Sequence, residues 1–253
     1  MNVQHPYLRQ IQLKRQQVPT YTRYPFDLAV IRNLNTLDFH PKVTYIVGEN
    51  GVGKSTLMES IAVAWGFNPE GGTINFSFST QATHSSLYEY IQLIRGPRRP
   101  RDGFFFRAES YYNLATTIDE LDSQPSFARP IIESYGGKSL HEQSHGESFF
   151  STFIHRFGEN GLYILDEPEA ALSPLRQMAM LTRIHELVLQ NSQFIIATHS
   201  PILMAYPDSI IYNLKPDGIE VQVLEETDHF MIMKEFMNNK DRMLRELFEE
   251  AQD

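Results

Sequence analysis

The spacing of apolar residues predicts short strands over residues 8–47. The stretch YLRQIQL alternates apolar and polar positions, and FDLAVI and VTYIV are short apolar runs. Alternation and short runs of this kind are typical of strands. The period changes after Gly48, where apolar residues at helical spacing predict a helix over residues 54–65.

Residues 73–146 have a looser pattern. HSSLYEYIQLI and YYNLATTIDELD have the spacing of helices, and FFFRAES has the composition of a buried strand. Between them, RGPRRPRDG, SQPSFARP and SYGGKSLHEQ are typical of loops. We expect these residues to form a mainly helical lobe that is inserted into the main domain.

A regular pattern returns after the lobe, beginning with a helix over residues 147–157. The buried strand GLYILDEPE follows, then the long helix SPLRQMAMLTRIHELVLQN with Pro174 in its first turn, the strand QFIIATHS and the pair SIIYNL and GIEVQVL. Residues 228–253 are predicted as a helical tail. We expect its apolar side chains to pack on the core, and docking in the groove of a partner is the less favoured alternative. This order predicts an α/β fold with a mainly parallel central sheet and a closing antiparallel part.

Composition narrows the class of protein. Of the 253 residues, 42% are hydrophobic and 12% aromatic, as in a globular chain with one sizeable core. The formal charge of −9 argues against a protein that coats nucleic acid with a basic surface. RGPRRPR nevertheless concentrates arginines that could contact phosphates, dock a partner or remain solvated.

Two absences set an expectation about location. The chain has no cysteine, which excludes disulfides and cysteine-based metal sites and suits a reducing compartment. We find neither a secretory signal nor an apolar run of transmembrane length. We therefore expect a cytoplasmic protein with no transmembrane segment of its own.

The stretch GENGVGKST, residues 48–56, is the first candidate site. It satisfies the pattern G-x-x-x-x-G-K-S/T between an apolar strand and a helix, which is the context of a phosphate-binding P-loop. Glycines let backbone N–H groups close around phosphate oxygens, and the helix N-terminus adds partial positive charge. We expect Lys54 to reach the β- and γ-phosphates of ATP and Ser55 to bind Mg²⁺. The residues expected to bind the nucleotide are Asn50, Gly51, Val52, Gly53, Lys54, Ser55 and Thr56.

Two adjacent acids follow the apolar strand of LYILDEPEAALSP. Asp166 stands where it can hold Mg²⁺, directly or through water. Glu167 stands one residue further on, where it can polarise the water that attacks the γ-phosphate. The alternative is that both are first-turn acids of a helix. In a chain with a P-loop, we favour the catalytic interpretation.

The triplet THS ends a third buried strand. His199 in this triplet can hydrogen-bond the γ-phosphate or the attacking water. A purely structural histidine is the alternative. The carboxyl ends of parallel strands form the crevice where α/β proteins bind ligands, so we favour a role for His199 in catalysis.

Together these motifs resemble those of ABC-type ATPases, in the branch that contains SMC, RecF and OLD-like proteins and small stand-alone AAA family ATPases. DEPEAALSP resembles the D-E-P-E-x-x-L-x-P form of that branch, and His199 matches its switch histidine. The resemblance implies a P-loop NTPase fold of the ABC type. It also implies that residues 1–253 form a single ATPase domain.

The resemblance further implies a signature loop, L-S-G-G-Q/E, just before the strand that ends at the catalytic acids. EQSHGES occupies that place, at the end of the predicted lobe. Ser144, Gly146 and Glu147 stand at the family's serine, second glycine and Gln/Glu positions. Gln143 and His145 depart from the pattern. Ser144, Gly146 and Glu147 are therefore expected to contact the nucleotide of a partner copy.

Two other family positions have less certain matches in this chain. An aromatic residue about two dozen positions before the P-loop stacks on adenine in the family, and Tyr24 stands at that distance. Tyr24 could equally be a packed strand residue. The glutamine of the family's Q-loop has two candidate positions, Gln81 and Glu109.

The resemblance implies that the protein binds and hydrolyses Mg²⁺-ATP. ATP binding would drive a head-to-tail homodimer, in which each signature loop completes the partner's site. The output would be a switch that acts on DNA or on a separate effector protein. Two alternatives stay open: the ATP-binding subunit of an ABC transporter, and a slow nucleotide-sensing module of a toxin or defence complex.

Overall fold

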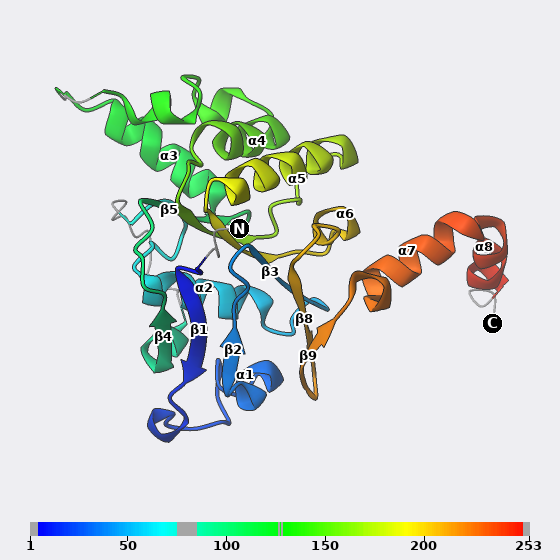
Figure 1. Cartoon of the computed structure of the whole chain (residues 1–253). Helices are drawn as coiled ribbons and strands as arrows, with labels where there is room; N and C mark the ends of the chain where they lie inside the picture. Colours follow the sequence, from blue (N-terminus) through cyan, green and yellow to red (C-terminus); the bar gives the residue numbers. More distant parts are fainter. Residues whose placement is uncertain (1–4, 75–84, 126, 128, 250–253) are drawn as a thin grey trace.

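Two sheets form the framework of the protein (Figure 1). The computed structural model describes residues 5–74, 85–125, 127 and 129–249. The smaller sheet is antiparallel and has the strand order β2–β1–β4. Its strands are β1 (Leu8–Leu13), β2 (Thr36–Asp38) and β4 (Ile91–Arg95).

The larger sheet has the strand order β5–β6–β7–β3–β8–β9. Its strands are β3 (Val43–Gly48), β5 (Asp102–Arg107), β6 (Gly161–Asp166), β7 (Gln193–Ala197), β8 (Ile210–Lys215) and β9 (Gly218–Gln222). Every neighbouring pair is parallel except β8 with β9. The predicted α/β fold, with a mainly parallel sheet and an antiparallel part, is confirmed.

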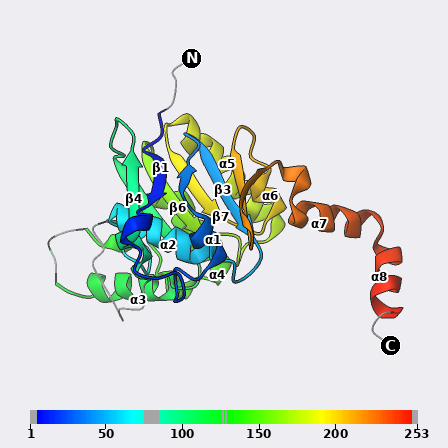
Figure 2. The same cartoon turned by 90° about the horizontal axis from the view of Figure 1, so that it is seen from below.

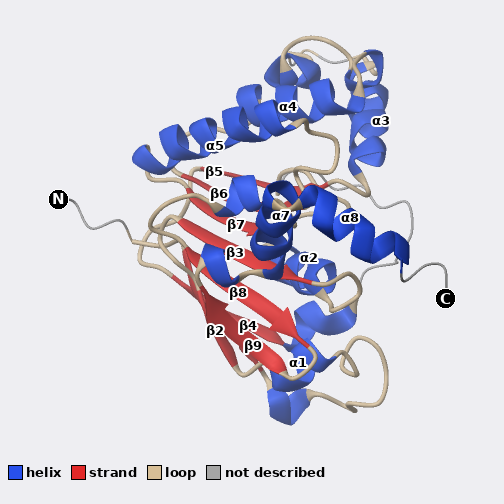
Figure 3. Ribbon diagram, turned by 90° about the vertical axis from the view of Figure 1, so that its right-hand side faces the viewer, coloured by secondary structure: helices blue, strands red, loops and turns tan. Residues whose placement is uncertain are grey.

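Helices cover both faces of the larger sheet (Figure 3). They are α1 (Ala29–Asn33), α2 (Lys54–Trp65), α3 (Tyr111–Asp122), α4 (His145–His155), α5 (Pro174–Leu189), α6 (Pro201–Met204), α7 (Asp228–Asn238) and α8 (Lys240–Glu249). Short 3-10 helices are η1 (Arg15–Gln17), η2 (Ser86–Tyr90), η3 (Ile131–Tyr135), η4 (Leu140–Glu142) and η5 (Leu224–Glu226). No helix in the described part of the chain is both long and apolar enough to cross a membrane.

Strand alternation divides the core into two apolar clusters, one on each face of the larger sheet. Successive side chains of a strand point to opposite faces. Tyr45 and Tyr163 therefore join the cluster under α3, α4 and α5. Ile46 and Ile164 join the cluster with α1, α2 and the smaller sheet. The register brings the carboxyl ends of β3, β6 and β7 to one edge, where the predicted motifs begin.

Two element predictions are wrong. FDLAVI was expected to be a strand, but its second half forms α1, and Phe26, Val30 and Ile31 are buried in one cluster. A short apolar run has no period that separates a strand from a helix. HSSLYEYIQLI was expected to be helical, but its described residues form η2 and β4. Pairing with β1 decides this outcome, since local propensity yields to tertiary pairing.

The range predicted as a mainly helical lobe, residues 73–146, contributes to both sheets. β4 is an edge strand of the smaller sheet, and β5 is an edge strand of the larger one. The helix α3 and the 3-10 helices η3 and η4 come after β5 and pack beside α4, whereas the 3-10 helix η2 precedes β4 (Figure 1). The range is therefore mainly helical only in its second half.

The C-terminal helices α7 and α8 project away from the two sheets (Figures 1 and 2). Neither helix has a buried residue. Their exposed apolar side chains are Met231, Ile232, Met233, Met237, Leu247 and Phe248. The tail is helical as predicted, but the prediction that its apolar side chains pack on the core is wrong. Other helices already cover both faces of the larger sheet.

Candidate active site

The P-loop runs from the end of β3 to the start of α2. Gly48 and Gly53 have φ angles of 141° and 109°, in a backbone region that favours glycine. A Cβ atom at Gly48 would lie 2.5 Å from the carbonyl oxygen of Leu214, so this position also requires close backbone approach. The loop thus wraps the first turn of α2, whose N–H groups lack intrahelical acceptors and can bind an anion.

Lys54 lies under this loop with only 5% of its surface exposed. Its Nζ donates to the carbonyl oxygens of Gly48 at 2.8 Å and Glu49 at 2.9 Å. Burial lowers the pKa of Lys54, while Glu167 and Asp166 oppose that shift. An ammonium has three donors, so a phosphate oxygen can join the two carbonyls as its third partner.

Ser55 and Asp166 bring two oxygen donors together at the start of α2. Ser55 Oγ donates to Asp166 Oδ1 at 3.3 Å. Asp166 is 4% exposed, and burial raises its pKa to about 6, although Ser55 and Arg107 act in the opposite direction. Mg²⁺ prefers hard oxygen ligands and takes few from the protein when phosphates and waters supply the rest. The hydroxyl and the buried carboxylate fit this ion.

Glu167 has a strained backbone conformation, and its side chain points toward His199. Its φ is 52°, and its N–H donates to the carbonyl oxygen of Ala197 on β7 at 3.0 Å. A positive φ at a non-glycine residue costs on the order of 1 kcal/mol and persists where neighbouring contacts impose it. Glu167 Oε1 lies 3.6 Å from His199 Nε2. The predicted base and the predicted phosphate sensor are therefore adjacent.

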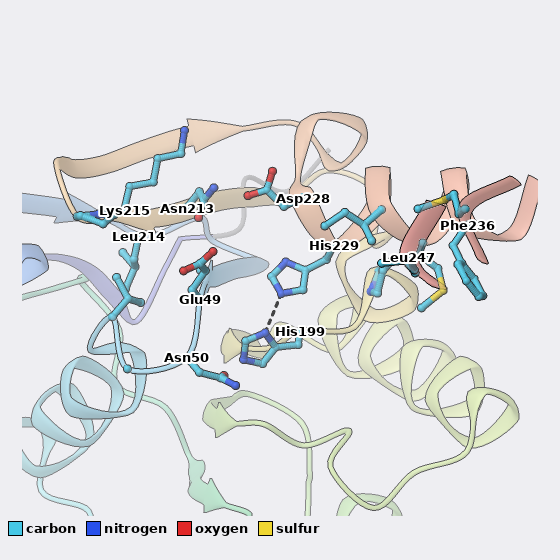
Figure 4. Close-up of a pocket in the computed structure, with 18 residues that line it drawn as sticks. Glu49, Asn50, His199, Asn213, Leu214, Lys215, Asp228, His229, Phe236 and Leu247 are labelled. Carbon is cyan, nitrogen blue, oxygen red and sulfur yellow. Dashed lines mark hydrogen bonds between the residues drawn. The ribbon is translucent and has the colours of Figure 1, made fainter. Parts of the chain in front are cut away.

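Two residues that the sequence analysis missed hold His199. The backbone N–H of His199 donates to Glu169 Oε1 at 2.6 Å. On the ring, His199 Nδ1 lies 2.7 Å from Nε2 of His229, which comes from α7 (Figure 4). His199 Nε2 is buried and has no hydrogen-bond partner among the residues that the structure describes. Burial, aided by Lys54 and His229, lowers the pKa of His199, which favours the neutral ring.

Sequence signals differ for these two partners. Glu169 belongs to the DEPE motif, so its position beside the candidate site could have been inferred. His229 follows His199 by thirty residues in a tail with no recognised motif, and nothing in the pattern joins the two.

Arg107 is a further residue that the sequence analysis missed. It ends β5 in register with Asp166. Its guanidinium donates to Glu59 Oε2 on α2 at 2.6 Å and to Glu109 Oε2 at 3.0 Å. Glu109, one candidate for the Q-loop position, is therefore paired with Arg107 and mostly exposed. Gln81, the other candidate, lies outside the described residues.

Tyr24 lies beside the first turn of α2. Its hydroxyl is 3.2 Å from Thr56 Oγ1, and 62% of its surface is exposed. It is therefore not a packed strand residue, and an exposed ring at this place fits stacking on a base. Adenine stacking by Tyr24 stays a prediction.

EQSHGES forms the start of α4. Ser144 is its N-cap, and Glu147 Oε2 accepts from the N–H and the Oγ of Ser144 at 3.0 and 2.7 Å. This is a capping box. A Cβ atom at Gly146 would lie 2.5 Å from the carbonyl oxygen of Ala171, so only glycine fits against the loop before α5. His145 packs on Tyr112, with ring centroids 4.9 Å apart.

The P-loop and EQSHGES line different cavities of the same chain. A cavity of about 1040 Å³ is lined by residues 48–52, by His199, by residues 213–216 and by the tail (Figure 4). Glu147 lines another hollow, together with residues of η4 and α5. Lys54, Ser55, Asp166, Glu167 and His199 lie at one sheet edge. Ser144 and Glu147 lie at the start of α4, where Glu147 lines a different hollow.

Two family models match this chain, and the residues that they match overlap. The model described as "AAA domain" matches residues 26–145. The model described as "AAA domain, putative AbiEii toxin, Type IV TA system" matches residues 135–205. Between them they include the P-loop, EQSHGES, the acids after β6, and His199.

Individual proteins are similar to this chain at low sequence identity. The energy-coupling factor transporter ATP-binding protein EcfA2 of Staphylococcus aureus is 24% identical over 208 residues, covering 74% of this chain and 70% of the relative. The SMC head domain from Thermotoga maritima is 15% identical with a TM-score of 0.41, covering 85% of this chain and 98% of that chain. An ATP-binding cassette of an ABC transporter, solved in its ADP conformation, is 18% identical with a TM-score of 0.48, covering 86% and 90%.

Proposed function

We propose that the chain is a P-loop ATPase of the ABC type that binds and hydrolyses ATP, and we assign residues to each step and an output to hydrolysis. The N–H groups of residues 50–56 and the ammonium of Lys54 bind the β- and γ-phosphates. Tyr24 stacks on adenine. The backbone geometry of the loop and the partly satisfied Lys54 support these assignments.

Glu167 acts as the general base, and His199 donates to the γ-phosphate. Ser55 and Asp166 hold Mg²⁺, which neutralises charge on the phosphates when it is bound. Glu167 orients the attacking water and takes its proton as the water oxygen bonds to the γ-phosphorus and the bond from that phosphorus to the β–γ bridging oxygen breaks, which releases ADP. The 3.6 Å between Glu167 Oε1 and His199 Nε2 supports this arrangement, because one γ-phosphate and its water can contact both groups.

ATP binding joins two copies of the chain head to tail. The single observation that supports this proposal is that Glu147 of EQSHGES lines a different hollow from the one that the P-loop of the same chain lines. If Ser144 and Gly146 contact a γ-phosphate, the phosphate belongs to a second copy, and two-fold symmetry then supplies both sites. Hydrolysis releases the two copies, and this switch acts on DNA or on a partner effector protein.

The substitution Glu167→Gln tests the dimer. It keeps the shape of the side chain but removes the base, so ATP stays bound and the dimer accumulates. We expect size-exclusion chromatography with light scattering to give twice the monomer mass with ATP and Mg²⁺, and the monomer mass without nucleotide. A Glu167→Gln protein that has ATP bound but stays monomeric contradicts the proposal.

Each of two alternative functions of ATP hydrolysis is supported by one observation. The similarity to EcfA2 favours the ATP-binding subunit of a transporter. The model that matches residues 135–205 favours a slow nucleotide sensor in a toxin complex. Hydrolysis rates measured for the protein alone, with duplex DNA and with a membrane protein that co-purifies with it separate these outputs. Stimulation by DNA supports the proposed switch, and turnover that requires the membrane protein supports the transporter subunit. A protein that binds ATP but does not turn over under any of these conditions supports the sensor.

A further inference from the structure

We propose that His229 is a positioning residue, which donates its Nε2–H to Nδ1 of His199 and thereby directs the Nε2–H of His199 at the γ-phosphate. The inference rests on the proposed role of His199. It adds a residue of the C-terminal tail to a site that otherwise comes from the edge of the larger sheet.

The contact between the two rings is short and well anchored. His199 Nδ1 and His229 Nε2 are 2.7 Å apart, and the ring planes meet at 56°, so the rings form a hydrogen bond rather than a stack (Figure 4). His229 is in the first turn of α7. Thr227 caps that turn by accepting from the N–H of Phe230, and its hydroxyl donates to the carbonyl oxygen of Leu224 at 2.7 Å. Thr227 is fully buried, which fixes the position from which His229 extends.

One proton lies between the two nitrogens, and its donor decides the tautomer of His199. If His199 donated from Nδ1, its Nε2 would present a lone pair to the Glu167 carboxylate 3.6 Å away and to an incoming phosphate. If His229 donates instead, His199 Nε2 carries a proton toward both anions. Electrostatics therefore favours His229 as the donor.

The surroundings favour the neutral form of both rings, and the proposed tautomer requires a neutral His199. Burial lowers the pKa of His199 and of His229, and the Lys54 ammonium shifts both pKa values in the same direction. Glu167 opposes the shift at His199, and Asp228 opposes it at His229. Within the described ranges no group hydrogen-bonds to the buried His199 Nε2, so a proton there is available to a ligand.

The amides of glutamine and asparagine give a matched test. In His229→Gln, the amide nitrogen is as many bonds from the main chain as Nε2 of histidine, so it can still donate to His199. In His229→Asn, the amide stops one bond short. We expect His229→Asn to lower kcat for ATP hydrolysis by about tenfold with KM for ATP unchanged, and His229→Gln to restore most of the loss. Met231→Gln, on an exposed position of the same helix, is the control and should match the wild type.

The comparison with His199→Ala separates the inference from the proposed function. If His199→Ala hydrolyses ATP at the wild-type rate, the proposed role of His199 fails. If His199→Ala is impaired but His229→Asn is not, or if Asn and Gln behave alike at position 229, only the role of His229 is overturned. In a His199→Ala background, we expect His229→Asn to have no further effect, because both changes remove one interaction.

Discussion

At the scale of single residues, the site combines buried charges with partners from other elements. Arg107 ends β5, its closest partner Glu59 lies on α2, and both are largely shielded from solvent. Arg107 also acts against the rise in the pKa of Asp166. This ion pair therefore joins the sheet edge to the helix that begins at the P-loop.

Removing Glu59 should destabilise the fold. Glu59→Ala leaves the Arg107 guanidinium without its buried partner and the N–H of Ser85 without an acceptor. We expect the free energy of unfolding, measured by urea denaturation, to fall by about 3 kcal/mol. Glu109→Ala is the matched control, because Glu109 pairs with the same arginine from an exposed position, and it should cost about 0.5 kcal/mol or less. Equal losses would contradict this account.

Which residues of the site could be predicted from the sequence depends on their chemistry. Lys54, Ser55 and Asp166 come together as expected, because phosphate and metal chemistry require specific side chains at fixed places after strands. Arg107 and His229 act only through other side chains. Their sequence surroundings contain no motif, so only the three-dimensional arrangement identifies them.

At the scale of elements, three helix starts carry candidate functional groups. α2 begins at Lys54, α4 begins beside Ser144, and α7 begins beside His229. These starts are capped or preceded by loops that pack closely on other segments. At α4, Gly146 touches the loop before α5, and this contact ties EQSHGES to the catalytic acids that precede that loop.

A methyl group at Gly146 should separate these two segments. Gly146→Ala places Cβ 2.5 Å from the carbonyl oxygen of Ala171, and backbone cannot give way as a flexible side chain can. We expect a loss of about 1 to 3 kcal/mol in the free energy of unfolding and slower ATP hydrolysis. His145→Ala, at the exposed neighbouring position, should cost less than about 1 kcal/mol. The idea of a close contact fails if Gly146→Ala is as stable as the wild type.

Element type was predictable where the apolar period was long, as in α2, α3 and α5. It was not predictable in FDLAVI or in YEYIQLI, where burial against neighbours chose the conformation of a short apolar run. The tail shows a different limit. Its apolar positions predicted burial, but whether a helix finds a partner depends on surfaces that other segments have already covered.

At the scale of the whole molecule, one chain presents two surfaces that the proposed dimer brings together. The sheet edge holds the P-loop, Glu167 and His199, and Ser144 caps the start of α4. The tail begins beside His199 and extends away from the body (Figures 2 and 4). In the proposed mechanism, the pair of His199 and His229 would connect ATP hydrolysis and dimer release to the tail.

Mixing two inactive variants tests the composite site most directly. Lys54→Ala removes the P-loop ammonium that binds the phosphates of its own site. Ser144→Arg disables the EQSHGES loop that completes the partner's site. Each protein alone should therefore be inactive. A mixed dimer contains one site with both parts intact. We predict that an equimolar mixture regains about a quarter of the wild-type ATPase rate, because half of the dimers are mixed and each has one working site. A mixture that stays as inactive as its components contradicts the account.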